Sequence, residues 1–131
     1  MTVGLFPICG DVLHAGHVVA LKEAKDNCDI LVVALNTHPD GKNPVESVYE
    51  RYTKLAELKC VDTVIPYQGR ADLELLAATF NYNVRFLGSD YIGKDWDGKE
   101  QEMSRGITAH FINRGLHGLS STELKERIKA S

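Results

Sequence analysis

The sequence predicts an α/β fold, a single-domain, three-layer sandwich with a five-stranded parallel sheet spanning residues 1–131. Three observations predict it. Short runs of apolar, often β-branched residues alternate with helix-like segments along the chain. The connections between these segments are short, which favours parallel strands joined by right-handed crossovers. No internal repeat, low-complexity stretch or linker interrupts the sequence, so we expect one domain.

The chain opens with two candidate strands around a helix. Thr2–Cys9 is mostly apolar and short enough for a buried strand. His17–Asn27 has apolar residues three or four positions apart, the spacing of a helix. Asp29–Leu35 is a continuous aliphatic run, which suits a parallel strand covered on both faces. Asparagine, proline, aspartate and glycine in residues 36–43 indicate a loop.

The alternation continues through the middle of the chain. Ser47–Lys59 predicts a helix, and Val61–Pro66 a third short strand. A second such pair follows, with a helix over Ala71–Phe80 and a strand over Val84–Gly88. Asp90–Glu102 is rich in glycine and charge, and we expect an irregular loop there.

The last predicted elements are a fifth strand over Ile107–Ile112 and a helix that begins at Ser120. Hydroxyl side chains at Ser120, Ser121 and Thr122, with Glu123 behind them, are typical of a helix N-cap.

Composition excludes several classes of protein. The formal net charge of −3 argues against a general nucleic-acid binder, which needs a basic surface. Three cysteines without CxxC spacing argue against a disulfide framework or a zinc site, so we expect reduced, buried thiols. No signal-like segment and no apolar run of membrane-spanning length is present. We therefore expect a cytoplasmic protein without a membrane span.

The segment His14-Ala15-Gly16-His17 is the strongest chemical signal. It follows the first strand, and ligands of parallel sheets bind beyond the carboxyl ends of the strands. A helix starting there presents free N–H groups and the positive end of its dipole, an anion site to which two imidazoles add donors. Three readings are open: phosphate binding, a metal pair, or surface histidines. Position favours phosphate, and no third ligand at zinc-protease spacing supports a metal.

The residues around this segment resemble the HxGH signature of the cytidylyltransferase-like nucleotidyltransferases, and most of all the small glycerol-3-phosphate cytidylyltransferases. Further motifs match in order along nearly the whole chain. They are Glu50-Arg51 with Val61-Asp62-Thr63-Val64-Ile65, Gly88-Ser89-Asp90 with Trp96-Asp97-Gly98-Lys99, and Arg114 with Gly118-Leu119-Ser120-Ser121-Thr122. The resemblance implies a Rossmann-like domain that acts as a homodimer.

That resemblance implies a set of site residues. Catalytic roles fall to His14, His17, Lys42 and Arg114. Nucleotide-binding positions are Cys9, Gly10, Asp11, His14, Gly16, His17, Arg51, Asp90, Arg114, Ser120, Ser121 and Thr122. Asp11 is expected to order its loop, and Arg51 and Arg114 to brace phosphate oxygens. Trp96 either shapes the pocket or only packs. Mg²⁺ is expected to arrive with the nucleotide rather than in a dedicated protein cage.

The implied reaction transfers a nucleotidyl group from CTP to a phosphorylated small alcohol and releases pyrophosphate. Glycerol 3-phosphate is the expected acceptor, giving CDP-glycerol. Phosphoethanolamine, phosphocholine or a sugar phosphate as acceptor, and ATP as nucleotide, are open alternatives. So is a nucleotide-binding module without catalysis, because Ile8-Cys9-Gly10 stands where the family usually has Gly-Thr-Phe.

Overall fold

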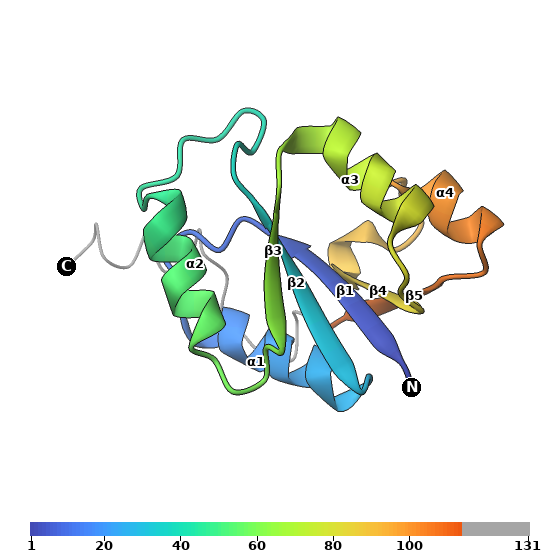
Figure 1. Ribbon diagram of the computed structural model, residues 1–131, viewed down its shortest axis with the longest axis horizontal. Helices are drawn as coiled ribbons and strands as arrows, with labels where there is room; N and C mark the ends of the chain where they lie inside the picture. Colours follow the sequence, from blue (N-terminus) through green and yellow to red (C-terminus); the bar gives the residue numbers. More distant parts are fainter. Residues whose placement is uncertain (114–131) are drawn as a thin grey trace.

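A computed structural model describes residues 1–113, which form one parallel sheet of order β3-β2-β1-β4-β5 with helices around it (Figure 1). The strands are β1 (Val3–Ile8), β2 (Ile30–Asn36), β3 (Thr63–Tyr67), β4 (Val84–Gly88) and β5 (Thr108–Ile112). The predicted five-stranded parallel sheet is confirmed. The helix expected from Ser120 lies outside the described residues.

Helices cover both faces of the sheet, giving the three expected layers (Figure 1). α1 (Ala15–Asp26) and α2 (Val48–Ala56) lie on one face. α3 (Gly69–Thr79) and the short α4 (Lys99–Ser104) lie together on the other. Among residues 1–113, no helix combines the length and the apolar character needed to cross a membrane.

Successive strand residues separate into two cores. In β1, Leu5 packs with Leu73 of α3, whereas Phe6 packs with Leu21 of α1. β2 is buried on both faces, as its aliphatic run predicts. This alternation fixes which side chains reach which side of the sheet.

The strand order produces a crevice. The chain runs from β1 outward to β3 and then returns to β4 on the other side of β1. The segments that leave β1 and β4 therefore go to opposite faces of the sheet, toward α1 and toward α4. In folds of this kind, the gap above those carboxyl ends is where ligands bind.

Two local predictions need correction. Helix α1 begins at Ala15 rather than His17, because His14 itself caps it. The region expected to be an irregular loop, Asp90–Glu102, includes most of the 3₁₀ turn Ser89–Tyr91 and the first part of α4. The apolar pattern missed α4 because the residue that this helix buries is a carboxylate, Glu102.

A glycine is required where the chain leaves β1. Gly10 has a φ of +70°, which costs an L residue about 1–2 kcal/mol. A Cβ there would lie 3.1 Å from Cδ1 of Leu55 on α2. The turn after β1 is thereby pressed against the second helix.

We predict that Gly10→Ala lowers the free energy of unfolding by about 2–4 kcal/mol, because it adds crowding to a strained backbone. Gly41→Ala is the matched control, since Gly41 has a φ of +69° but open space around it. Its cost is expected to stay near 1 kcal/mol. Urea denaturation measures both, and equal losses would contradict the close contact with Leu55.

Candidate functional site

A cavity of about 700 Å³ lies over the carboxyl ends of the strands. This is within the range of small-molecule sites. Residues of the β1–α1 turn line one side of it, and residues of β3, α3 and the segment after β4 line the other. Among the lining residues are Cys9, Gly10, Asp11, His14, Gly16, His17, Lys42, Tyr67, Arg70, Arg85, Tyr91, Trp96 and Asp97.

His14 and His17 cap α1 reciprocally. The Gly16 amide donates to Nδ1 of His14 at 3.0 Å. The His14 amide donates to Nδ1 of His17 at 3.2 Å. The two ring centroids lie 4.2 Å apart, as residues three positions apart on one helix face should.

These bonds set the tautomers of both rings. A ring nitrogen that accepts a hydrogen bond carries no proton, so each neutral imidazole carries its proton on Nε2. Both Nε2–H groups are therefore donors beside the N-terminus of α1, where the helix dipole also favours an anion. Burial lowers the pKa of His14 below its usual value and so favours this neutral form.

Asp11 orders the turn by binding the segment before α2. Its two carboxylate oxygens accept from the amides of Val45 and Glu46, each at 3.0 Å. The Glu46 carboxylate in turn accepts from the Val12 amide at 2.7 Å and pairs with Lys54. Val12 has a φ of +49°, an outlier for a β-branched residue. The reciprocal bonds hold that strained residue in place.

Arg51 has a different surrounding from the one expected. It is 2% exposed and does not line the cavity. Its Nη1 donates to the carbonyls of Cys9 and Asn36, each at 2.8 Å. Its remaining donors point to the carbonyls of Thr37 and Glu46. The guanidinium thus joins the ends of β1 and β2 and lies behind Cys9, which lines the cavity.

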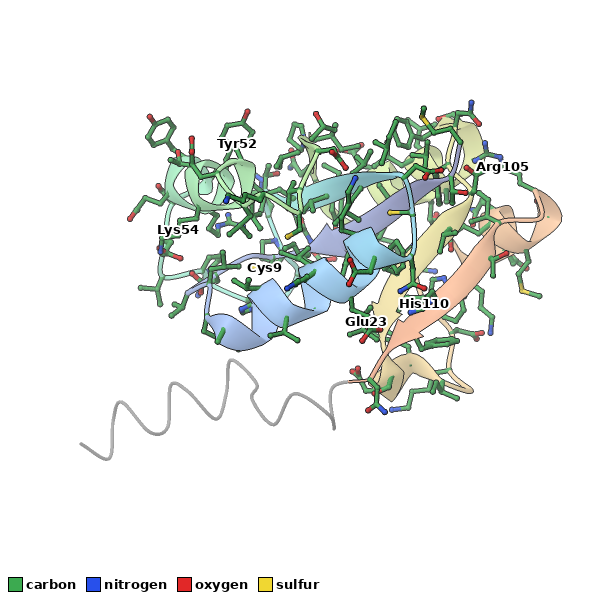
Figure 2. The ribbon with its side chains drawn as sticks, turned by 90° about the horizontal axis from the view of Figure 1, so that it is seen from below. Cys9, Glu23, Tyr52, Lys54, Arg105 and His110 are labelled. Carbon is green, nitrogen blue, oxygen red and sulfur yellow. The ribbon has the colours of Figure 1, made fainter. Side chains whose placement is uncertain are left out.

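Only some of the other predicted residues line the cavity. Lys42 is exposed on the loop after β2 and lines the cavity. Cys9 lines it as well, at the arrowhead end of β1 in Figure 2, and like the other two cysteines it is free and half-buried rather than buried. Asp90 is exposed and is not a lining residue, whereas its neighbour Tyr91 is one. Four predicted residues lie outside the described part of the chain: Arg114, Ser120, Ser121 and Thr122.

The α3 side of the cavity holds polar residues that the motifs do not mark. Tyr67, Arg70 and Arg85 line it beside Asp97, which the motifs do include. Burial raises the pKa of Tyr67 to about 12, so its hydroxyl stays neutral. A guanidinium inside the apolar run Val84–Gly88 is a signal in the sequence for the unmarked residues of this side.

Metal ligands do not cluster in the described part of the chain. No group of three or more histidine, cysteine, aspartate or glutamate side chains there could hold an ion. Both oxygens of Asp11, the carboxylate nearest the histidines in sequence, already accept from backbone amides.

A pH prediction follows from the cap of α1. Because the folded pKa of His14 is lowered, the unfolded chain binds more protons below pH ~6.5. The contribution of His14 to stability is therefore complete above that pH and is lost as the pH falls toward the folded pKa.

NMR titration of the His14 ring should give a pKa below ~6.5, with His14→Asn identifying its resonance. Asparagine is a good N-cap that does not titrate. The variant should therefore lose less stability than the wild type between pH 7 and 5. A His14 ring that titrates at or above 6.5 would contradict this view of the cap.

The chain is similar to larger curated proteins. It is 33% identical over 134 residues to the "Bifunctional protein HldE" of Granulibacter bethesdensis, covering 98% of this chain and 27% of that protein. It is 38% identical over 129 residues to the protein of that name from Helicobacter hepaticus, covering 94% and 26%. The chain thus spans about a quarter of the length of these relatives.

Solved structures share its fold. A lipopolysaccharide core biosynthesis protein from Thermoplasma volcanium superposes with a TM-score of 0.66 and 27% identity, over 85% of this chain and 93% of that one. A pantothenate synthetase from Thermus thermophilus gives a TM-score of 0.51 over 96% of this chain and 64% of that one. At 14% identity, the second likeness shows the fold alone.

One family model accounts for nearly the whole sequence. It matches residues 5–127 and describes a cytidylyltransferase-like domain. That span includes the β1–α1 turn with both histidines, most of β1 and all of the other four strands. The chain therefore belongs to the cytidylyltransferase-like nucleotidyltransferase family.

Proposed function

We propose that this chain transfers a nucleotidyl group from a nucleoside triphosphate to the phosphate of a sugar phosphate, releasing pyrophosphate. One observation carries the proposal: a single cavity joins the N-terminus of α1, with its two imidazoles, to a polar wall beside α3. The first can hold the phosphates that react, and the second can hold the rest of the acceptor.

The chemistry is a direct in-line displacement. A phosphate oxygen of the acceptor forms a bond to the α-phosphorus while the bond from that phosphorus to the oxygen bridging to the β-phosphorus breaks. Pyrophosphate takes the electron pair. The attacking oxygen is already ionised, so no protein base is required. What the protein must supply is orientation and stabilisation of the charge that develops on the phosphoryl oxygens.

His14 and His17 suit that task. Their Nε2–H donors lie beside the N-terminus of α1, where the helix dipole favours an anion, and the reciprocal cap fixes both rings before the substrate arrives. Lys42 extends from an exposed loop on the cavity rim and can follow the charge as pyrophosphate leaves. Arg51 adds positive charge from behind the wall, where its contact with the Cys9 sulfur is 3.8 Å.

We propose that Mg²⁺ enters with the triphosphate. Residues 1–113 offer no carboxylate cluster for it, and phosphate oxygens with water are ligands that Mg²⁺ prefers. When bound, the ion would neutralise phosphate charge. Removing it with a chelator should abolish turnover, and added Mg²⁺ should restore it.

A sugar phosphate is favoured as acceptor by two similarities. Relatives of the HldE name match across almost the whole chain. The Thermoplasma structure is named for lipopolysaccharide core biosynthesis, and such a core is built of sugars. The second candidate, CTP with glycerol 3-phosphate, rests on the sequence motifs around His14 and Arg114. The proposal covers only nucleotidyl transfer and no other activity of the longer relatives.

A pyrophosphate-release assay distinguishes these reactions. It pairs CTP and ATP in turn with sugar 1-phosphates, glycerol 3-phosphate, phosphocholine and phosphoethanolamine. We expect turnover with a sugar phosphate. Release only with glycerol 3-phosphate would select the second candidate. Nucleotide binding without release from any pair would refute transfer and indicate a binding module.

His17 gives the sharpest mutational test. We predict that His17→Ala lowers kcat by about 10²-fold or more, the cost of losing a preorganised donor to a developing negative charge. His17→Asn should lose as much, although its oxygen can still accept from the His14 amide and preserve the cap. His110→Gln is the control, because His110 pairs with Glu23 between β5 and α1, away from the cavity (Figure 2). Near-normal kcat in both His17 variants would contradict the role.

A further inference from the structure

Arg85 is an unusual residue for the centre of a strand. It lies in β4, opposite Leu5 of β1 and Ala109 of β5. It is 5% exposed, and yet it lines the cavity. Its neighbour Phe86 belongs to the core on the α1 side, so Arg85 extends to the α3 side, across the sheet from the histidines.

The guanidinium of Arg85 is only partly satisfied. Nη1 donates to Oε2 of Glu102 at 3.0 Å and to the carbonyl of Asp97 at 3.2 Å. Nε is buried and has no hydrogen-bond partner. Nη2 also makes no hydrogen bond within residues 1–113. Unpaired donors on a buried side chain are rare and need an explanation.

The orientation of Arg85 is fixed by its neighbours. Glu102 is 1% exposed and accepts from three side chains: Arg85, Tyr82 and the indole of Trp96, the last at 2.9 Å. A Cβ on Gly98 would lie 3.6 Å from Nη1 of Arg85. The orientation of the unpaired Nη2 is thus fixed by a rigid network.

Both guanidiniums on this side of the cavity are paired with carboxylates. Arg85 pairs with Glu102, while Arg70 lies 2.7 Å from Glu74 and 3.4 Å from Asp97. Two guanidiniums face three carboxylates, so an added phosphate or carboxylate group would gain little. A neutral group that both accepts and donates hydrogen bonds fits better, and a sugar hydroxyl is such a group.

We propose that Arg85 is a specificity-determining residue that donates to a hydroxyl of the acceptor's sugar. The inference rests on the proposed transfer to a sugar phosphate and adds the residue that selects the sugar. The acceptor's phosphate lies at the histidines, and its hydroxylated end lies against Arg85, with the Asp97 carboxylate and the Tyr67 hydroxyl on the same wall. A short acceptor such as glycerol 3-phosphate leaves these donors unpaired.

Arg85→Lys tests the assignment, because lysine keeps the charge opposite Glu102 but removes the unpaired donors. Steady-state kinetics with the sugar 1-phosphate that the wild type uses should show KM for that acceptor raised about tenfold or more. KM for the nucleotide and kcat should stay within about threefold, because the reacting groups lie at the histidines. With the matching series of monodeoxy sugar phosphates, one analogue should have the same KM in wild type and variant.

Arg105→Lys is the matched control. Arg105 contacts the Tyr82 ring and donates to the carbonyls of Ala77 and Phe80, but it does not line the cavity. It lies near the right edge of the molecule in Figure 2, away from Cys9. The control should leave every KM unchanged.

Other outcomes overturn the inference. An unchanged KM for the sugar phosphate in Arg85→Lys would contradict it. A KM raised equally for all the deoxy analogues, with kcat falling in parallel, would indicate a structural role instead. If the wild type transfers only to glycerol 3-phosphate, nucleotidyl transfer stands and the role of Arg85 falls. If it transfers to nothing, the proposed function fails. In that case, calorimetric titration measures the binding of sugar 1-phosphates to the wild type and to Arg85→Lys. The inference requires binding to the variant to be about tenfold weaker, and equal binding would contradict it.

Discussion

The buried guanidinium of Arg51 is the interaction on which the site depends. Within residues 1–113 no carboxylate pairs with it, and its donors go instead to carbonyls at the ends of β1 and β2 and before α2. Hydrogen bonds to a charged group are among the stronger ones, and an unpaired buried charge is costly. Moving these carbonyls would leave the buried charge of Arg51 unpaired, so their positions are constrained. This constraint fixes the turn after β1, and both histidines come directly after that turn in the chain.

The same turn explains why the unusual residues after β1 are compatible with a phosphate site. Cys9 contributes its carbonyl to Arg51, and Gly10 lets the chain turn against Leu55. Neither role needs the hydroxyl that the family usually has there. The proposed anion site uses imidazole rings at a helix N-terminus, so the departures from the family pattern leave these groups in place.

The two sides of the cavity differ in their polar groups. The α1 side has two imidazoles at a helix N-terminus, together with Lys42, Asp11 and Asp40. On the α3 side, Arg70 and Arg85 are paired with carboxylates. The first arrangement suits the phosphates of the proposed reaction, and the second suits groups recognised by hydrogen bonds. Alternation along the strands produces this division, because adjacent residues face opposite layers.

The sequence predicted those parts of the molecule in which apolar residues are buried and charged residues are exposed. Aliphatic runs marked all five strands, and the HxGH spacing brought the two histidines together. The sequence did not indicate which charged residues are buried. Glu102 made α4 look like a loop, and nothing in the sequence marked Arg51 as buried. Periodicity treats such residues as exposed, because the partners that satisfy them lie far away in the chain.

Isotope labelling tests the central claim most directly. An acceptor with ¹⁸O in its phosphate would be converted with the wild-type protein, and the products analysed by mass spectrometry. Attack by the acceptor's phosphate on the α-phosphorus predicts that all the label stays in the nucleotide-sugar and none enters the pyrophosphate. Label in the pyrophosphate, or release of unmodified nucleoside monophosphate as the product, would contradict the account.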